Sequence, residues 1–152
     1  MIALLEAVQA SAFAAYVRDS VLLYPFANVA HVVAVMVFFA AVAVMDLRLL
    51  RVIRGMPVPL VIERLRPVAV GALVVIAATG LTLFVPEAAA TARNQAFLLK
   101  LAAIALALGN IAVNEWALRR DGESSRTVQV TAGLSLALWL STAALGRAIA
   151  YV

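Results

Sequence analysis

The sequence predicts an all-α integral membrane protein, a bundle of four transmembrane helices preceded by an amphipathic interfacial helix. Of its 152 residues, 66% are hydrophobic and only 13% are charged. Soluble domains are about 45–50% apolar and about 25% charged, and a chain this short has too little interior to bury the excess. The apolar residues also gather into four long runs. We therefore expect one integral membrane domain over residues 1–152, surrounded by a lipid bilayer.

The four runs have the length of membrane spans. A helix rises about 1.5 Å per residue, so crossing a hydrocarbon layer about 30 Å thick takes about 20 apolar residues. Uncharged runs of this length cover residues 26–45, 67–86 and 127–146, and residues 94–114 form a fourth run whose one charge is Lys100. Allowing for helix ends, the expected spans are about 25–50, 67–86, 95–118 and 127–150.

The first segment, residues 2–19, differs from the spans in composition. Its apolar residues alternate with Glu6, Gln9, Ser11 and Arg18, a mixture that predicts a helix lying in the membrane interface. The segment lacks the basic start of a secretory signal and carries an acidic residue within its apolar part. We therefore expect it to be retained in the protein.

The basic residues predict the orientation of the bundle. Short cytoplasmic loops collect Lys and Arg. The connection between the first and second spans and the connection between the third and fourth spans are both rich in arginine, so we expect both in the cytoplasm and both termini outside. The basic excess then reflects topology and attraction to anionic lipids, and no nucleic-acid partner is expected. Eight of the 12 basic residues lie in or beside these connections, namely Arg48, Arg51, Arg54, Arg64, Arg66, Arg119, Arg120 and Arg126.

Polar side chains within the spans mark a candidate site, because placing them in lipid costs a few kcal/mol or more. Counted from the outer ends of their spans, several lie at a similar depth in the outer half. Asn28 lies one helical turn before His31 on the same face. If the polar faces of the spans turn toward the centre of the bundle, they form a polar pocket that opens to the outside. The candidate binding residues are His31, Lys100, Asn28, Thr79 and Thr142.

His31 is the one histidine in the chain, and three roles are compatible with it. It can be a neutral hydrogen-bond partner between helices, an axial ligand to a haem iron, or a proton relay. Lys100 can extend toward water or lipid phosphate, or it can hold a carboxylate such as a porphyrin propionate. A haem would make His31 the metal-binding residue.

Other polar residues predict structural roles. Asp46 and Glu115 lie at the inner ends of their spans beside arginines, which predicts ion pairs at the membrane interface. Thr131, Ser135 and Trp139 recur every four residues. This spacing predicts packing against another helix, with the hydroxyls bonded to carbonyls one turn back.

Several short segments form a pattern over nearly the whole chain: residues 24–31 (YPFANVAH), 46–50 (DLRLL) and 79–81 (TGL), then Asn94, Phe97, Lys100 and Asn110. This pattern resembles a bacterial family of small four-helix membrane proteins of unknown function. Its most specific parts are the histidine span ending in Asp-Leu-Arg and the Asn-x-x-Phe-x-x-Lys start of the third span. The resemblance implies a multi-pass protein of the bacterial inner (cytoplasmic) membrane.

In layout alone, the chain is more distantly similar to the membrane domain of copper-resistance protein D, to the small membrane protoporphyrinogen oxidase and to small dihaem b-type cytochromes. The oxidase has a histidine on its first span, a lysine at the start of a later one and a b-type haem. That similarity implies a haem pocket formed by His31 and Lys100. The chain departs from the dihaem cytochromes, because two bis-histidine haems need four histidines. A copper site also lacks ligands, since there is no cysteine and the methionines lie away from His31.

The favoured hypothesis is a membrane protein that binds haem b through His31, with electron transfer as a further expectation. The second axial ligand would come from water, Lys100 or a second protomer. The alternative is a non-catalytic membrane anchor or accessory subunit of a larger complex. Spans rich in Ala and Val favour a homo-oligomer or partner membrane subunits. A solute transporter has less support, because the sequence shows no inverted repeat.

Overall fold

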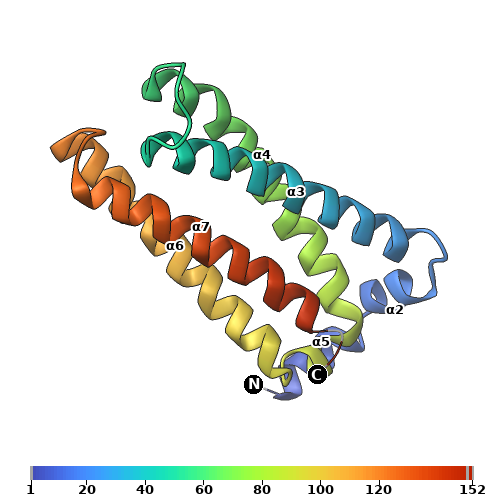
Figure 1. The fold of residues 1–152 in the computed structure, drawn as a ribbon. Helices are drawn as coiled ribbons and strands as arrows, with labels where there is room; N and C mark the ends of the chain where they lie inside the picture. Colours follow the sequence, from blue (N-terminus) through green and yellow to red (C-terminus); the bar gives the residue numbers. More distant parts are fainter. Residues whose placement is uncertain (1, 150, 152) are drawn as a thin grey trace.

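The structure, a computed structural model, describes residues 2–149 and residue 151. Every helix or strand assigned in this part of the chain is a helix, which confirms the predicted all-α class. Residue 150, the predicted end of the last span, and residues 1 and 152 of the predicted domain lie outside the described residues. Figure 1 shows the elements in chain order: α1 (Ile2–Gln9), α2 (Ala12–Asp19), α3 (Leu23–Leu49), α4 (Val58–Phe84), the 3-10 helix η1 (Val85–Glu87), α5 (Ala88–Thr91), α6 (Gln95–Asp121) and α7 (Arg126–Ala148).

Four helices, α3, α4, α6 and α7, are long and apolar enough to cross a membrane. The first three have 27 residues each and α7 has 23. All four therefore exceed the length of about 20 residues that a bilayer core requires. The chain is a multi-pass membrane protein with the four predicted spanning helices, and its apolar outer surface needs a lipid environment.

Helix α4 begins at Val58, well before the predicted start of the second span at residue 67. The prediction located the uncharged run, whereas the helix continues through charged residues whose side chains are exposed: Glu63, Arg64 and Arg66. Long charged side chains can extend to the headgroup region while the backbone stays helical. Pro67 lies inside the helix on an exposed position, which spanning helices tolerate.

Polar caps fix the ends of the second helical pair. The Asn94 side chain accepts a hydrogen bond from the backbone N–H of Phe97 at 3.1 Å, so α6 begins just after it. Gly122 ends α6 with a φ of 75°, a left-handed conformation that glycine adopts without strain. Ser125 then caps α7 by accepting from the backbone N–H of Thr127. A short polar turn therefore suffices to reverse the chain.

The N-terminal segment is two short helices rather than the single helix predicted over residues 2–19. Ser11 interrupts it, because the Ser11 side chain caps α2 by accepting from the backbone N–H of Ala14. The pair packs on η1 and α5. Gln9 accepts from the backbone N–H of Ala89 at 3.0 Å, and Arg18 donates to the carbonyl of Pro86 at 2.9 Å. These contacts hold the segment at one end of the bundle.

The spanning helices form two hairpins, α3 with α4 and α6 with α7, which meet along α3 and α7. The helices α4 and α6 have few contacts, among them the stacked rings of Phe84 and Phe97 and the Arg66–Glu115 ion pair, so the bundle is open along most of that side (Figure 1). The α3–α4 and α6–α7 connections lie together at what we call the loop end. The helices α1, α2 and α5 lie at the opposite terminal end, near the end of α7.

An aromatic pair joins the two hairpins at their centre. The rings of Phe38 on α3 and Trp139 on α7 pack edge to face, with centroids 4.5 Å apart and planes at 77°. Small side chains surround the pair, including Ala41, Ala72 and Ala107. Packing of small residues brings helices close in a membrane, where the hydrophobic effect does not drive them together.

Candidate functional site

His31 and Lys100 both lie on the inward-facing stripes of their helices. On α3, His31 follows the buried Ala27 by four residues and precedes the buried Ala34 by three. On α6, Lys100 stands between the buried Ala96 and Ala103 with the same spacing. Side chains three and four residues apart share a helix face, so both polar residues are directed toward the centre of the bundle.

The imidazole of His31 is held by α4. Its Nδ1 lies 2.9 Å from Oγ1 of Thr79. The Thr79 hydroxyl already donates to the backbone carbonyl of Val75 at 2.6 Å, so its oxygen is left to accept. We therefore assign the ring proton to Nδ1, which donates to Thr79. Nε2 then carries a lone pair and can accept a proton or bind a metal.

Gly80 provides the space that this ring occupies. A Cβ added at Gly80 would lie 3.3 Å from Cε1 and 3.7 Å from Nδ1 of His31. The first distance is tighter than most Cβ contacts in proteins, so any larger residue would push the ring away. Thr79 and Gly80 are adjacent, and together they fix both the hydrogen bond and the position of the imidazole.

Lys100 lies against α7 in a similar way. A Cβ added at Gly146 would lie 3.3 Å from Nζ of Lys100, so the ammonium is close to the α7 backbone. Within residues 2–149 and 151, no carboxylate forms an ion pair with Lys100. The ammonium interacts electrostatically with His31. The two groups therefore belong to different hairpins but are within electrostatic range of each other.

The other two predicted site residues have no polar contact with His31 in the described part of the chain. Thr142 is buried on α7, and its hydroxyl donates to the carbonyl of Leu138 at 2.9 Å. Asn28 on α3 is exposed. The structure thus places Thr79 at the imidazole and Lys100 within electrostatic range of it, while neither Thr142 nor Asn28 has a described polar contact with it.

A second polar group, which the sequence prediction missed as a site, lies nearer the loop end. A cavity of about 360 Å³ is lined there by residues of all four spanning helices. Its polar lining includes Asp46 on α3, Asn110 and Asn114 on α6, and Ser135 on α7. Asp46 and Asn110 are both buried. Neither His31 nor Lys100 lines this cavity.

The predicted ion pair of Asp46 at the membrane interface is wrong. Asp46 is only 7% exposed, and in the described part of the chain its Oδ2 has no hydrogen-bond partner. The error arose because Asp46 was judged by its neighbours in sequence, Arg48 and Arg51. Its helix face was the better signal, since Asp46 is four residues after the buried Val42 and shares that inward stripe.

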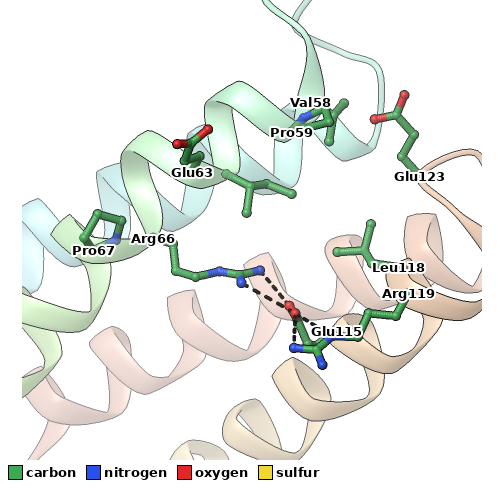
Figure 2. Close-up of a pocket in the computed structure, with 10 residues that line it drawn as sticks. Val58, Pro59, Glu63, Arg66, Pro67, Glu115, Leu118, Arg119 and Glu123 are labelled. Carbon is green, nitrogen blue, oxygen red and sulfur yellow. Dashed lines mark hydrogen bonds and ion pairs between the residues drawn. The ribbon is translucent and has the colours of Figure 1, made fainter.

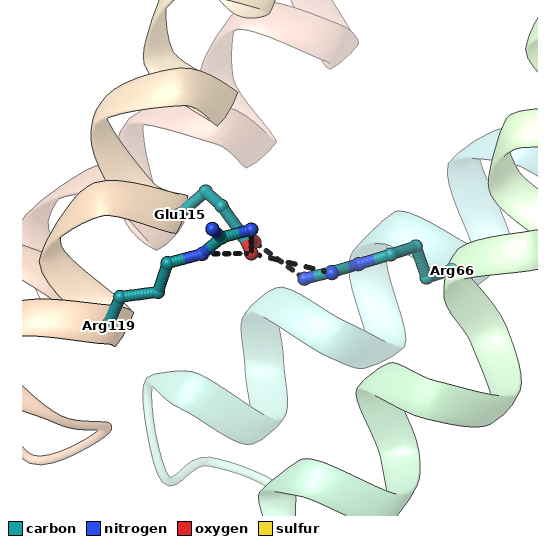
Figure 3. Close-up of polar contacts among 3 residues, drawn as sticks. All are labelled: Arg66, Glu115 and Arg119. Carbon is teal, nitrogen blue, oxygen red and sulfur yellow. Dashed lines mark hydrogen bonds and ion pairs between the residues drawn. The ribbon is translucent and has the colours of Figure 1, made fainter.

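The predicted ion pairing of Glu115 is confirmed. Its carboxylate lies 2.6 Å from Arg66 on α4 and 3.0 Å from Arg119 one turn later on α6, as Figure 3 shows. These three side chains line a wider cavity of about 620 Å³ at the loop end, together with Val58 and Pro59, as Figure 2 shows. The Arg66–Glu115 pair bridges the open side between α4 and α6.

The predicted packing of Thr131, Ser135 and Trp139 is confirmed, since all three are buried, and the predicted hydrogen bond one turn back is described for Thr131. Thr131 is buried, and its hydroxyl donates one turn back, to the carbonyls of Thr127 at 3.0 Å and Val128 at 3.1 Å. It accepts in turn from the amide of Asn114 at 2.6 Å. Thr131 therefore joins α7 to α6 beside the cavity.

Within the described residues, no group of three or more His, Cys, Asp and Glu side chains could hold a metal ion. A haem-type site needs fewer protein ligands, because the porphyrin supplies four donors to the iron. Comparisons of the chain with models of protein families, with curated proteins and with solved structures found no match. The functional argument therefore rests on the residues themselves.

Proposed function

We propose that this multi-pass membrane protein binds a b-type haem in the half of the bundle nearer the terminal end, with His31 as one axial ligand. The observation that carries the proposal is the hydrogen bond between Nδ1 of His31 and Oγ1 of Thr79, 2.9 Å long. Histidines that bind metals usually donate their second ring N–H to a neighbouring acceptor, which fixes the tautomer and the ring orientation. Thr79 is such an acceptor.

Lys100 is the residue that would hold a haem propionate. Its ammonium lies on the inward face of α6 without a carboxylate partner among the described residues. An amine in this position gains a counter-ion when a carboxylate binds. Asn28 and Thr142 would then line the porphyrin edge. A bound haem would supply one-electron exchange, whose potential depends on the axial ligands and the surrounding polarity.

The proposal includes an orientation. The loop end carries most of the arginines, which favours a cytoplasmic loop end and both termini outside. The haem would then lie nearer the outer face of a bacterial inner membrane, and the two short N-terminal helices would lie in the outer interface. The second axial ligand would come from water, Lys100 or a second protomer.

The proposal is tested by the absorption spectrum. The protein is expressed with a haem precursor, purified in mild detergent and compared with His31→Ala. We expect a Soret band in the wild-type protein that is lost in the variant while both elute as folded protein. A colourless wild-type preparation, obtained although haem supply was ample, would contradict the proposal.

One observation favours a second candidate function, that of a non-catalytic anchor or accessory subunit. Helix α4 buries only Val58, Val61, Ala69 and Ala72, and none of its residues after Ala72 is buried. A spanning helix with so little buried surface offers a free face to a second copy or to another membrane subunit. Mass measurement in lipid nanodiscs distinguishes the two candidates, because the subunit hypothesis predicts a stable, colourless oligomer or complex.

A further inference from the structure

The cavity of about 360 Å³ contains a carboxylate that the proposed haem site does not use. Asp46 lies in a membrane-spanning helix, is only 7% exposed and has one oxygen, Oδ2, without a partner in the described chain. Burying such a group costs several kcal/mol unless a ligand, a proton or a counter-ion compensates it. Ser135 lines the same cavity and interacts with the Asp46 side chain. The carboxylate is therefore an incomplete site.

Two amide oxygens in the same cavity also lack donors among the described residues. Asn110 donates through its Nδ2 to the carbonyl of Thr131 at 2.9 Å. A carbonyl only accepts, so this contact fixes the amide orientation and leaves Oδ1 without a described partner. Asn114 donates through Nδ2 to Oγ1 of Thr131 at 2.6 Å. The Thr131 hydroxyl donates elsewhere, so the Oδ1 of Asn114 is left as well.

The buried polar side chains of the cavity thus present acceptor oxygens that lack described donors, while the two arginines that line it are exposed. Arg66 and Arg119 are both paired with Glu115. The remaining walls are largely apolar and include Phe38 and Ile111. An ammonium group has three donors and no acceptor, so it complements these oxygens. An anionic ligand would lie against the buried carboxylate of Asp46.

We propose that this cavity binds a small apolar molecule that carries one protonated amine, with Asp46 as its counter-ion. The amide oxygens of Asn110 and Asn114 accept further hydrogen bonds from the ammonium, and the apolar walls contact the rest of the ligand. A bare metal ion does not fit as well, because most of the wall is apolar and the volume is far larger than an ion needs.

The open side between α4 and α6 supplies the route by which an amine would enter the cavity. The side between the two helices is bridged at the loop end by the Arg66–Glu115 pair and toward the terminal end by the stacked rings of Phe84 and Phe97, and the helices have few other contacts. Apolar amines dissolve in lipid, and they would reach Asp46 from the bilayer through this opening.

The test uses the full-length protein in phosphatidylcholine nanodiscs, whose zwitterionic lipid avoids electrostatic uptake of amines. Calorimetry compares phenethylamine with its neutral analogue 2-phenylethanol, and empty nanodiscs provide the background. We expect saturable binding of the amine and at least about tenfold weaker binding of the alcohol. Asp46→Asn should remove the preference for the amine, whereas Asp19→Asn, an exposed aspartate at the terminal end, should preserve it.

Equal affinities for amine and alcohol, or an unchanged preference in a folded Asp46→Asn protein, would overturn the proposal. If that variant does not fold, a chemical modification of the wild-type protein still tests the proposal. The hydrophobic reagent dicyclohexylcarbodiimide should modify Asp46, located by mass spectrometry, and phenethylamine should slow this reaction. Absence of modification at Asp46, or modification that the amine does not slow, would also overturn it. The Soret band depends on His31, so the two proposals fail independently.

Discussion

Arg66 of α4 and Glu115 of α6 lie 2.6 Å apart and form the one described ion pair between the two hairpins. The pair stands at the loop end, where the helices it joins do not pack against each other. Their side chains are 50% and 30% exposed, so water and lipid headgroups weaken the attraction. The pair therefore sets the spacing of α4 and α6 more than the stability of the bundle.

Replacing Glu115 should widen the open side of the bundle. We expect Glu115→Gln to change the free energy of unfolding by no more than about 1 kcal/mol, because exposed ion pairs contribute little. The distance between spin labels at the loop ends of α4 and α6 should become longer and more broadly distributed. Glu63→Gln is the matched control, since Glu63 is exposed on α4 and forms no ion pair within the described residues. Equal distance distributions in the two variants would refute the bridging role.

Thr79 should affect haem binding through His31. We expect Thr79→Val to weaken haem retention by about tenfold or more, because the imidazole loses the acceptor that fixes its tautomer. Thr82→Val is the control, since the Thr82 hydroxyl donates only to the carbonyl of Ala78 on its own helix. Haem occupancy after dilution or competition with apomyoglobin measures the difference. Similar losses in both variants would indicate a general effect on α4.

Lys100 should affect haem retention without affecting the fold. We expect Lys100→Met to keep the bundle intact, because Met retains the length of the side chain and removes a buried charge. The rate of haem loss should rise, since a propionate would lose its counter-ion. Arg93→Met removes an exposed cation at the same end and should leave the rate unchanged. Unchanged haem occupancy in Lys100→Met would count against the propionate role.

Gly80 should control the environment of His31. We expect Gly80→Ala to displace the ring, because the new Cβ would lie 3.3 Å from Cε1. Gly71→Ala on the same helix meets nothing within 4 Å and should be neutral or slightly stabilising by helix propensity. Because the chain has one histidine, ¹⁵N-histidine labelling gives signals from this ring alone. The wild-type shifts should show a protonated Nδ1, and only Gly80→Ala should change them.

Phe38 should contribute to stability through its contact with Trp139. We expect Phe38→Ala to lower the free energy of unfolding by roughly 2 kcal/mol, the part of a Phe→Ala cost that comes from the cavity left behind. The part that comes from transferring the Phe side chain between the protein core and its surroundings is small, because lipid is as apolar as the core. Phe26→Ala is the control, since Phe26 is 67% exposed. Unfolding in detergent mixtures, followed by circular dichroism, compares the two variants.

The order and type of the helices could be predicted because local features specify them. A run of about 20 apolar residues cannot remain in water, and in lipid its backbone must satisfy its own hydrogen bonds. The prediction of α4 was less accurate at its start, because hydropathy locates the hydrocarbon layer and not the helix end. Ser11 was not recognised as a cap, so α1 and α2 were predicted as one helix.

In the candidate site, too, some features could be predicted from the sequence and others could not. The depth of His31, Thr79 and Lys100 followed from counting residues along each span. Which residue touches which did not follow, because a span can rotate about its axis without changing its depth. Thr79 and His31 bond across α3 and α4, while Thr142 bonds to its own helix. Asp46 was assigned from its arginine neighbours in sequence, although its inward position depends on the rotation of α3.

The amino-acid sequence by itself determined that this chain is a four-span, all-helical membrane protein, since hydropathy and length act within each segment. The tertiary structure alone decided that the two hairpins pack along α3 and α7, while α4 and α6 have few contacts with each other. It also decided that Asp46 lies in a cavity and not at the membrane surface. The physical reason is that packing of small side chains sets rotation and spacing between helices, and such packing depends on pairs of segments rather than on any one of them.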